Sequence, residues 1–260
     1  MNLNRTLLGL ITLVFVMTGK AEIKSKSVEY KEGTTILEGF AVFDDAIQGK
    51  RPGVLVVHQW KGLGDYEKKR AEMLARLGYN VFAVDIYGKG VRPNNPTDAA
   101  TEAAKYKENR RLLRARVTAG LEMLKKHELT DPTKIAALGY CFGGTTALEL
   151  ARSGADIAGV VSFHGALSTP NAADARRIKC KVLALHGADD PFVPLKEVEA
   201  FQEEMRQGGV DWQFAAYGGA VHSFTDWSAG KDNSKGAAYN EKADKRSWEA
   251  MKQFFTELFR

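Results

Sequence analysis

Apolar residues occur along this chain in short continuous runs that alternate with stretches of helical periodicity. The runs Gly53–His58, Asn80–Asp85 and Lys181–His186 are apolar at nearly every position, as expected for strands covered on both faces. Between them, segments such as Asp65–Leu77 repeat apolar residues every three or four positions, which predicts amphipathic helices. Strands that alternate with helices form βαβ units. We therefore predict an α/β fold with a mostly parallel, doubly wound sheet flanked by helices.

The same patterns predict further elements. Strands are expected at Thr35–Phe43, Lys134–Leu138, Ile157–Phe163 and Trp212–Ala216, and helices at Thr97–His127, Gly143–Arg152, Leu195–Gln207 and Tyr239–Phe259. The first of these strands reads as an edge strand, and about six of the others should run parallel in one domain. In open sheets of this kind, functional sites form just beyond the carboxyl ends of the strands.

The N-terminal segment has the pattern of a signal peptide. Arg5 precedes the apolar run Leu7–Met17, whose 11 residues are too few for a transmembrane helix, which needs roughly 20. Gly19 and Ala21 supply the small residues of a cleavage site after Ala21. We predict a secreted, most simply periplasmic, protein whose single mature domain covers residues 22–260 without stable membrane insertion. An uncleaved N-terminal anchor is the alternative.

Composition and charge narrow the function. Apolar residues make up 44% of the chain and charged residues 27%, which is typical of globular proteins. Two cysteines exclude a disulfide scaffold and a Cys-built zinc site. The net charge is +5, but the sequence has no stripe of Lys and Arg interleaved with aromatic residues, the pattern typical of nucleic-acid binding. We expect Arg110, Arg111, Arg114 and Arg116 to form a solvated helix face, and predict no nucleic-acid binding.

A first candidate for chemistry lies between a predicted strand and a predicted helix. The segment GYCFGG has the G-x-nucleophile-x-G pattern, with Cys141 in the place of a serine. Gly139 and Gly143 relieve the crowding of a sharp turn that lifts the Cys141 side chain above the sheet. The N-terminus of the following helix directs N–H groups at the sulfur and favours the thiolate. A structural cysteine in a glycine-rich turn is the alternative.

An acid and an imidazole follow two other strands. The segment HGADDPFVP lies at the end of one strand and AVHSF follows the next. Asp189 and Asp190 are adjacent, so only one of them can point into a site, and the other suits an ordinary turn. A lone His222 would most simply be structural. The chain order Cys141, an aspartate and His222 is, however, the nucleophile–acid–histidine order of α/β-hydrolases.

These motifs resemble those of the dienelactone hydrolase family, α/β-hydrolases with a Cys-His-Asp triad. The similarity extends over nearly all of the predicted mature chain, and GYCFGG, HGADDPFVP and VHSF are its most specific parts. The resemblance implies that Cys141 is the nucleophile and His222 the base. It makes Asp190 the orienting acid, because the family's acid directly precedes a residue followed by Phe-Val-Pro.

The segment HQWKGL, which follows the strand Gly53–His58, matches the family as well. The resemblance makes this segment the oxyanion loop and the backbone N–H groups of Trp60 and Phe142 its two donors. Gln59 stands where the family has a glutamate that takes part in activating the thiol. An amide neither accepts a proton nor carries charge, so the role of Gln59 is limited to hydrogen bonding.

The resemblance also indicates candidates for the substrate pocket. These are Gln59, Tyr87, Lys89 and Phe224. Dienelactone hydrolases bind a carboxylate-bearing lactone through arginines. At the corresponding positions Lys89 retains the positive charge, and Asp226, four residues beyond His222, reverses it. These departures argue against a dienelactone as the substrate, whereas the predicted fold and triad do not depend on them.

We therefore predict a hydrolase that cleaves small carboxylic esters or lactones through a thioacyl-enzyme, without a cofactor or metal, as a monomer or small homo-oligomer. A thiol redox or peroxide-reactive protein and a catalytically inactive binding module are alternatives. The redox alternative lacks a C-x-x-C motif, and Cys180 is expected at the opposite edge of the sheet. A metal hydrolase is a third alternative, because His58, His164, His186 and His222 fall at strand ends, but their spacing is not that of paired ligands. His58 and His186 are expected to support the site by hydrogen bonding.

Overall fold

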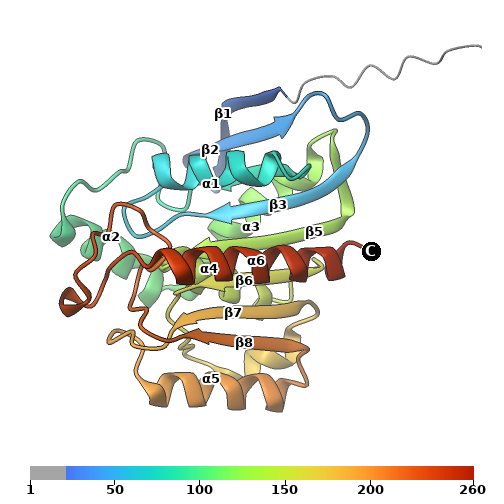
Figure 1. Cartoon of the computed structure of the whole chain (residues 1–260). Coiled ribbons are helices and arrows are strands. Elements are labelled where there is room, and N and C mark those ends of the chain that lie inside the picture. Colours follow the sequence, from blue (N-terminus) through green and yellow to red (C-terminus); the bar gives the residue numbers. More distant parts are fainter. Residues whose placement is uncertain (1–21) are drawn as a thin grey trace, which may run out of the picture.

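A computed structural model describes residues 22–260 and contains one eight-stranded sheet in the order β1-β2-β4-β3-β5-β6-β7-β8. The six strands from β4 to β8 in this order are parallel, and β1 and β2 form an antiparallel extension. Helices cover both faces of the sheet (Figure 1). The predicted signal peptide lies outside the described residues. Within residues 22–260, every helix is too short or too polar to cross a membrane.

The elements alternate along the chain much as predicted. The strands are β1 (Ile23–Glu32), β2 (Thr35–Asp44), β3 (Arg51–Val57), β4 (Asn80–Val84), β5 (Thr130–Tyr140), β6 (Gly159–Phe163), β7 (Lys181–Gly187) and β8 (Trp212–Tyr217). The helices are α1 (Asp65–Ala75), α2 (Pro96–Glu108), α3 (Arg110–Lys126), α4 (Phe142–Arg152), α5 (Leu195–Gly208) and α6 (Glu241–Leu258), with two 3₁₀ helices, η1 (Ala172–Arg177) and η2 (Asn233–Lys235).

The edge of the sheet differs from the prediction. The strand at Thr35–Phe43 was expected at the edge, but β2 lies between β1 and β4. β1 pairs with the whole of β2, from Ile23 opposite Asp44 to Glu32 opposite Thr35. The hydrophobic pattern misses β1 because most of its side chains are polar and exposed, as is common for a strand that protects a sheet edge.

The long helix predicted over Thr97–His127 is two helices. Asn109 separates α2 from α3 with a backbone conformation of φ −117° and ψ 77°, which is not helical. Its side chain accepts the backbone N–H of Leu112 and so caps α3. Asparagine is a favourable N-cap residue, and this local hydrogen bond ends one helix where the apolar periodicity continues.

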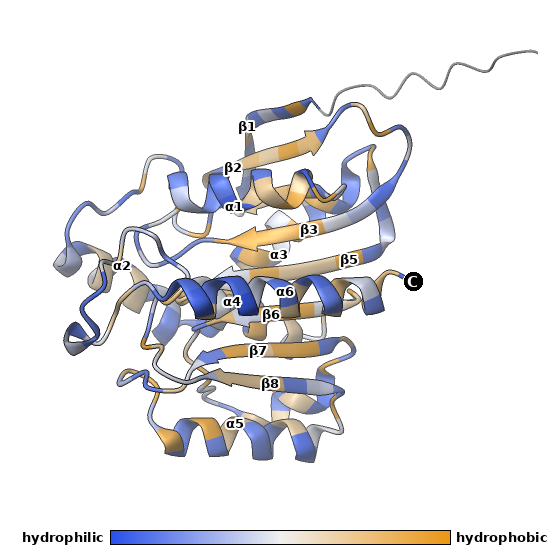
Figure 2. Ribbon diagram, in the orientation of Figure 1, coloured by the Kyte–Doolittle hydropathy of each residue, from blue (hydrophilic) through white to orange (hydrophobic). Residues whose placement is uncertain are grey.

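Apolar side chains pack on both faces of the sheet, as the continuous runs predict. Along β3, Leu55 and Val57 enter one core, whereas Val54 and Val56 enter the other. Figure 2 shows the central strands as the most hydrophobic part of the fold. Helices α2 to α5 cover the first core, and α1 and α6 cover the second (Figure 1).

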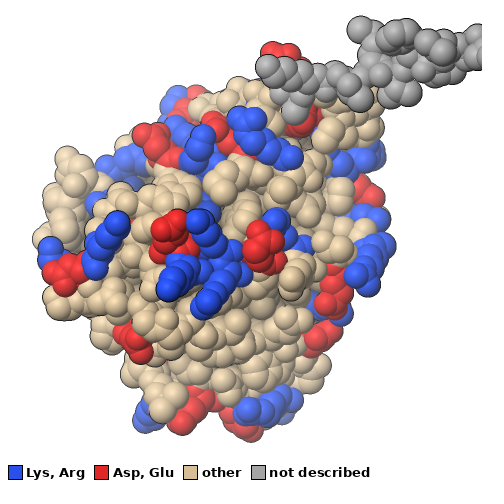
Figure 3. Space-filling model, in the orientation of Figure 1, with Lys and Arg blue, Asp and Glu red and all other residues tan. Residues whose placement is uncertain are grey.

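Of the four arginines that we predicted to form a solvated face of α3, only Arg111 is exposed. Arg114 contacts Glu149 at 2.8 Å and Asp174 at 2.6 Å. Arg116 is buried and lies 3.3 Å from Glu32. The sequence pattern could not show this, because the acidic partners come from other elements. On the face in Figure 3, basic side chains lie among acidic ones.

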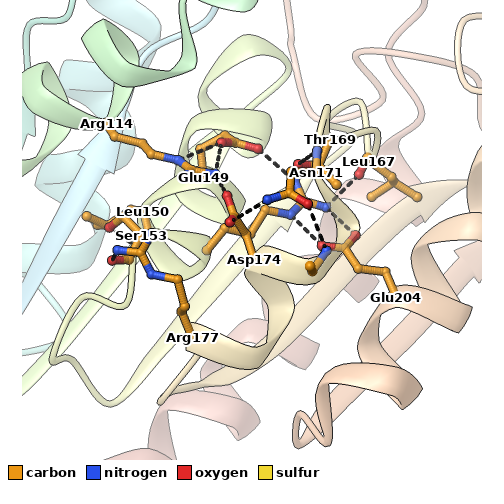
Figure 4. Close-up of polar contacts among 12 residues, drawn as sticks. Arg114, Glu149, Leu150, Ser153, Leu167, Thr169, Asn171, Asp174, Arg177 and Glu204 are labelled. Atoms are coloured by element: carbon orange, nitrogen blue, oxygen red, sulfur yellow. Dashed lines mark hydrogen bonds and ion pairs between the residues drawn. The ribbon is translucent and has the colours of Figure 1, made fainter.

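A buried ion cluster joins α4 to its neighbours. Figure 4 shows Arg114, Glu149 and Asp174 in contact, with Glu204 of α5 on the far side. Arg152 of α4 is fully buried between these acids, 3.1 Å from Glu149 and 2.7 Å from Glu204. Buried charges are tolerated when they are paired in this way, and leaving one partner alone is strongly destabilising. The cluster therefore anchors the helix whose first turn follows Cys141.

Candidate active site

The carboxyl ends of the parallel strands bring three predicted side chains together. Cys141 follows β5, Asp190 follows β7 and His222 follows β8. Nε2 of His222 lies 3.0 Å from Sγ of Cys141, and Nδ1 lies 2.8 Å from Oδ2 of Asp190. A thiol, an imidazole and a carboxylate thus form one continuous hydrogen-bonded chain, the arrangement that nucleophilic catalysis requires.

The turn that presents Cys141 requires its neighbouring glycines. Cys141 has a φ of 54° and a ψ of −115°, an unusual conformation for a residue with a side chain. A Cβ atom at Gly139 would lie 2.1 Å from the carbonyl oxygen of Gly143. A Cβ atom at Gly143 would lie 2.2 Å from the carbonyl oxygen of Val57. The strand, the turn and the helix can approach this closely only with glycine at both positions.

Asp189 and Asp190 point in different directions. Asp190 directs Oδ2 at His222, and its Oδ1 accepts the backbone N–H of Phe192 at 2.9 Å. Asp189 instead accepts the backbone N–H of Gly219 at 2.9 Å. The second aspartate of the pair is therefore the one beside the imidazole, in the register that the Phe-Val-Pro match implies.

The environment of the pair favours a thiolate and an imidazolium. Burial raises the pKa of Cys141, but the charge and hydrogen bond of His222 and the N–H of Phe142 outweigh it, and the net pKa lies below the usual value. Burial lowers the pKa of His222, but the Cys141 charge and the Asp190 hydrogen bond raise it to about 10. Cys141 is half-buried rather than on an exposed elbow as we expected.

Cys180 has the opposite environment, which predicts selective alkylation. It is buried before the first residue of β7, and burial raises its pKa to about 12. Iodoacetamide should therefore modify Cys141 much faster than Cys180 in the folded protein, and the reaction at Cys141 should persist below the usual thiol pKa of about 8.5. Peptide mass mapping over time measures both rates. Earlier labelling of Cys180 would contradict this difference in environment.

Glu67 of α1 holds the predicted oxyanion loop. Its two carboxylate oxygens accept the backbone N–H groups of Gln59 and Gly64, each at 3.0 Å. Tyr87 donates its hydroxyl to the carbonyl oxygen of Trp60 at 3.0 Å. Among residues 22–260, no hydrogen bond occupies the Trp60 N–H. Sequence reasoning missed Glu67, for which the only signal is a glutamate in the first turn of the helix that follows the loop.

A cavity of about 1080 Å³ opens over these groups. Cys141, His222, Trp60 and Phe142 line it, together with Gln59 among the predicted pocket residues. Both predicted oxyanion donors therefore belong to residues that face the same space as the thiol. Phe192 is exposed at the rim and lies edge-on to the His222 ring, with centroids 5.6 Å apart.

Three other pocket candidates lie elsewhere. Tyr87 is buried behind Trp60, and its ring packs against neighbouring aromatic side chains. Lys89 forms an exposed ion pair with Glu29 of β1, a strand that the sequence did not predict. Phe224 is fully buried and belongs to the core instead of the cavity. Proximity in sequence to the catalytic motifs did not determine where these side chains point.

Gln59 and Asp226, the two departures from the family pattern, contact each other. The Gln59 amide donates to Oδ2 of Asp226 at 3.0 Å, and both residues line the cavity. Oδ1 of Asp226 accepts the N–H and hydroxyl of Ser228 at 2.8 and 2.7 Å. All these donors are neutral, and Asp226 forms no ion pair among the described residues.

The remaining strand-end histidines do not assemble a metal site. Nε2 of His58 accepts the N–H of Ile86 at 3.1 Å, and burial lowers the pKa of His58 to about 4. Nδ1 of His164 accepts the N–H of Cys141 at 3.1 Å. Nδ1 of His186 is buried without a hydrogen-bond partner in the described part of the chain. No three His, Cys, Asp or Glu side chains within residues 22–260 are grouped to hold a metal ion.

Comparisons with known proteins identify a family and similar structures for this chain. The model of the dienelactone hydrolase family matches residues 37–259. A solved structure of a dienelactone hydrolase-like promiscuous phosphotriesterase from metagenomic libraries is 41% identical, with a TM-score of 0.88 over 93% of this chain and 100% of that one.

Two curated proteins are also similar. A protein of Aquifex aeolicus with the provisional name carboxymethylenebutenolidase is 30% identical over 209 residues, or 78% of this chain and 87% of that protein. An uncharacterised protein of Caenorhabditis elegans is 37% identical over 149 residues, or 56% of this chain and 94% of that protein.

The mostly parallel sheet, the sharp turn after β5 and the sites at the strand ends define an α/β-hydrolase fold. Within that class, the chain belongs to the dienelactone hydrolase family.

Proposed function

We propose that this protein hydrolyses carboxylic esters or lactones through a covalent thioacyl-enzyme formed on Cys141. The observation that carries the proposal is the continuous chain from Asp190 through His222 to the Cys141 sulfur, which opens into the cavity. A buried cysteine with a merely structural role would need neither a lowered pKa nor a base within 3.0 Å.

The mechanism follows from the positions of these groups. The Cys141 thiolate attacks the carbonyl carbon and forms a tetrahedral intermediate. His222 then donates its proton to the leaving alkoxide, and the thioester remains on the enzyme. A water molecule, deprotonated by His222, attacks the thioester, and the acid product leaves with the thiolate restored. Asp190 holds the imidazole through Nδ1, which keeps Nε2 directed at the reacting groups.

The backbone N–H groups of Trp60 and Phe142 are proposed to stabilise the oxyanion. Both residues line the cavity with Cys141, and Glu67 fixes the loop that contains Trp60. A donor of this kind is worth about 10²–10³-fold in rate. General base catalysis by His222 supplies about 10²–10⁴-fold more.

A hydrolysis screen over short esters and lactones tests the proposal, with the Cys141→Ala protein as the blank. Substrate should disappear faster with the wild type than with the blank, and acid-quenched wild type should carry an acyl group on the peptide that contains Cys141. A chelator should leave the rate unchanged. Chelator-sensitive turnover without an acyl adduct would instead support a metal hydrolase.

Phosphotriester hydrolysis is a second candidate activity. It is favoured by the 41% identity, over nearly the whole chain, to a promiscuous phosphotriesterase. The same thiolate and N–H donors would act on phosphorus in place of carbon. A neutral phosphotriester such as a dialkyl nitrophenyl phosphate, assayed beside the matching nitrophenyl ester, compares the two activities directly.

We further expect Asp226 to disfavour substrates with an anionic acyl group. The Asp226→Asn change should raise kcat/KM for the 4-nitrophenyl monoester of succinate relative to 4-nitrophenyl butyrate by about two- to fivefold, because it removes one negative charge from the cavity wall. Salt should reduce this effect.

The Asp232→Asn change is the matched control for this selectivity. Asp232 forms the same kind of turn, accepting the N–H of Ser234 at 3.0 Å and its hydroxyl at 2.6 Å, but it does not line the cavity. It should leave the succinate-to-butyrate ratio unchanged. Equal ratios for the two variants would show that Asp226 does not influence substrate charge.

A further inference from the structure

His164 lies directly behind the nucleophile, at the end of the neighbouring strand β6. Its Nδ1 accepts the backbone N–H of Cys141 at 3.1 Å. The same N–H also contacts the carbonyl oxygen of Phe163 at 3.0 Å, so two acceptors share it. His164 is fully buried and has a φ of 40°, in the left-handed region. A positive φ is unusual for histidine, and His164 adopts it beside the turn that presents the thiol. This combination indicates a functional role in addition to packing.

Burial sets the charge of this imidazole, and its hydrogen bonds set the tautomer. Burial holds the pKa of His164 well below its usual value, and the neighbouring charges of His222, Arg70 and His186 lower it further. The ring is therefore neutral. Because Nδ1 accepts the Cys141 N–H, the single ring proton is assigned to Nε2, which lies 2.7 Å from Oγ1 of Thr225.

Thr225 connects His164 to a rigid buried group. Oγ1 of Thr225 lies 2.7 Å from the hydroxyl of Tyr66, which accepts from Nε of Arg70 at 3.1 Å. Arg70 also donates to the carbonyl oxygen of Thr225 at 2.9 Å and to Asp244 at 2.5 Å. Its guanidinium lies over several aromatic rings, including that of Tyr66 at 5.3 Å. The far end of the chain of hydrogen bonds is thus a paired, caged cation with little freedom to move.

We propose that His164 is a positioning residue for Cys141. Held by Thr225 as the neutral Nε2–H tautomer, it accepts the Cys141 N–H and keeps the turn in the conformation that places Sγ 3.0 Å from His222. Its neutrality also matters, because the rings of His164 and His222 lie 5.4 Å apart and a second cation would oppose the imidazolium. The inference rests on the proposed role of Cys141 as the nucleophile.

Two substitutions of His164 separate hydrogen bonding from backbone strain. His164→Asn and His164→Gly both tolerate a positive φ. Asparagine supplies a side-chain oxygen that can accept the Cys141 N–H, whereas glycine supplies no acceptor. We expect His164→Asn to retain most of the kcat and His164→Gly to lose about a hundredfold at an unchanged KM, because a misplaced nucleophile affects the chemical step.

Alkylation of Cys141 gives a readout that does not depend on turnover. The iodoacetamide rate should be followed from about pH 4 to 9. In His164→Gly the apparent pKa of the thiol should rise by about one unit, because Sγ moves away from the imidazolium. In His164→Asn it should stay close to the wild-type value. Thermal unfolding of each variant reports whether the fold is retained.

Thr225 supplies a second, independent pair of variants. Thr225→Val removes the hydroxyl that fixes the tautomer, so the pKa for alkylation should rise as in His164→Gly. Thr225→Ser keeps the hydroxyl, so the apparent pKa for alkylation should stay close to the wild-type value. This pair tests the proposal even where His164→Gly fails to fold.

Equal kcat values and alkylation profiles for His164→Gly and His164→Asn, or for Thr225→Val and Thr225→Ser, would overturn the positioning role. The two proposals fail in distinguishable ways. Hydrolysis that survives Cys141→Ala refutes the nucleophile, whereas the alkylation profiles still report whether His164 positions the sulfur.

Discussion

Cys141→Ala is expected to abolish ester hydrolysis and to leave the fold intact. Removing the nucleophile of a comparable serine triad lowers kcat by about 10⁶-fold, because the remaining groups act only through a covalent intermediate. The change is small, and Cys141 is half-buried at a turn instead of packed within a core. Initial rates on the best ester of the screen measure the effect, and circular dichroism with thermal unfolding verifies the fold.

Cys180→Ala is the matched control for this experiment. It removes the other cysteine, which is buried at the opposite end of the sheet from Cys141. It should lower thermal stability modestly through lost packing and leave kcat unchanged. Retained turnover in Cys141→Ala would exclude Cys141 as the nucleophile, and turnover lost in Cys180→Ala without unfolding would show that the effect is not specific to Cys141.

Asp190→Asn is expected to reduce kcat far more than Asp189→Asn. The carboxylate of Asp190 lies 2.8 Å from Nδ1 of His222, where it fixes the tautomer and supports the positive charge. In a serine protease, the equivalent change costs about 10⁴-fold. The carboxylate of Asp189 accepts the backbone N–H of Gly219 and does not contact His222. The Asp189→Asn change should therefore affect the local turn and little else.

The pH dependence of Cys141 alkylation shows in which direction the Asp190 charge shifts the pKa of the thiol. Asp190 helps to raise the pKa of His222 to about 10, and the resulting imidazolium lowers the pKa of Cys141. Without the Asp190 charge the pKa of His222 falls and the imidazolium is less populated. The thiolate of Cys141 then loses part of its stabilising charge, so the alkylation profile of Cys141 should shift to higher pH. An unchanged profile, or equal losses of kcat in both asparagine variants, would show that the wrong aspartate has been assigned.

The triad could be located from sequence because each member follows a strand with a strong apolar pattern. Strands buried on both faces have no polar alternation, and parallel strands place their carboxyl ends at one edge of the sheet. Cys141, Asp190 and His222 therefore had to lie near one another once the strands were found. The need for Gly139 is equally local, because its Cβ would meet Gly143 in the same turn, whereas the need for Gly143 arises from Val57 on a distant strand.

The pocket was predicted less well, because the direction of a loop side chain depends on distant contacts. Phe224 lies two residues beyond His222 but turns into the core, and Lys89 turns outward to Glu29 on a strand whose polar sequence hid it. The contact between Gln59 and Asp226 joins residues 167 positions apart. Sequence periodicity contains no information about such a pair.

The sequence by itself thus determined the α/β class, the parallel strands and the three side chains at their ends. The class and the strands follow from periodicity, and chain order places a cysteine, an aspartate and a histidine at strand ends, whereas the choice of Asp190 over Asp189 came from the resemblance to the family. The tertiary structure alone decided which charges are paired, as for Arg114 between Glu149 and Asp174, and which side chains bond the backbone around the site, as for His164 at Cys141 and Glu67 at Gln59. Burial and hydrogen-bond partners are set by elements that meet only after folding, and these fix the charge, tautomer and direction of a side chain.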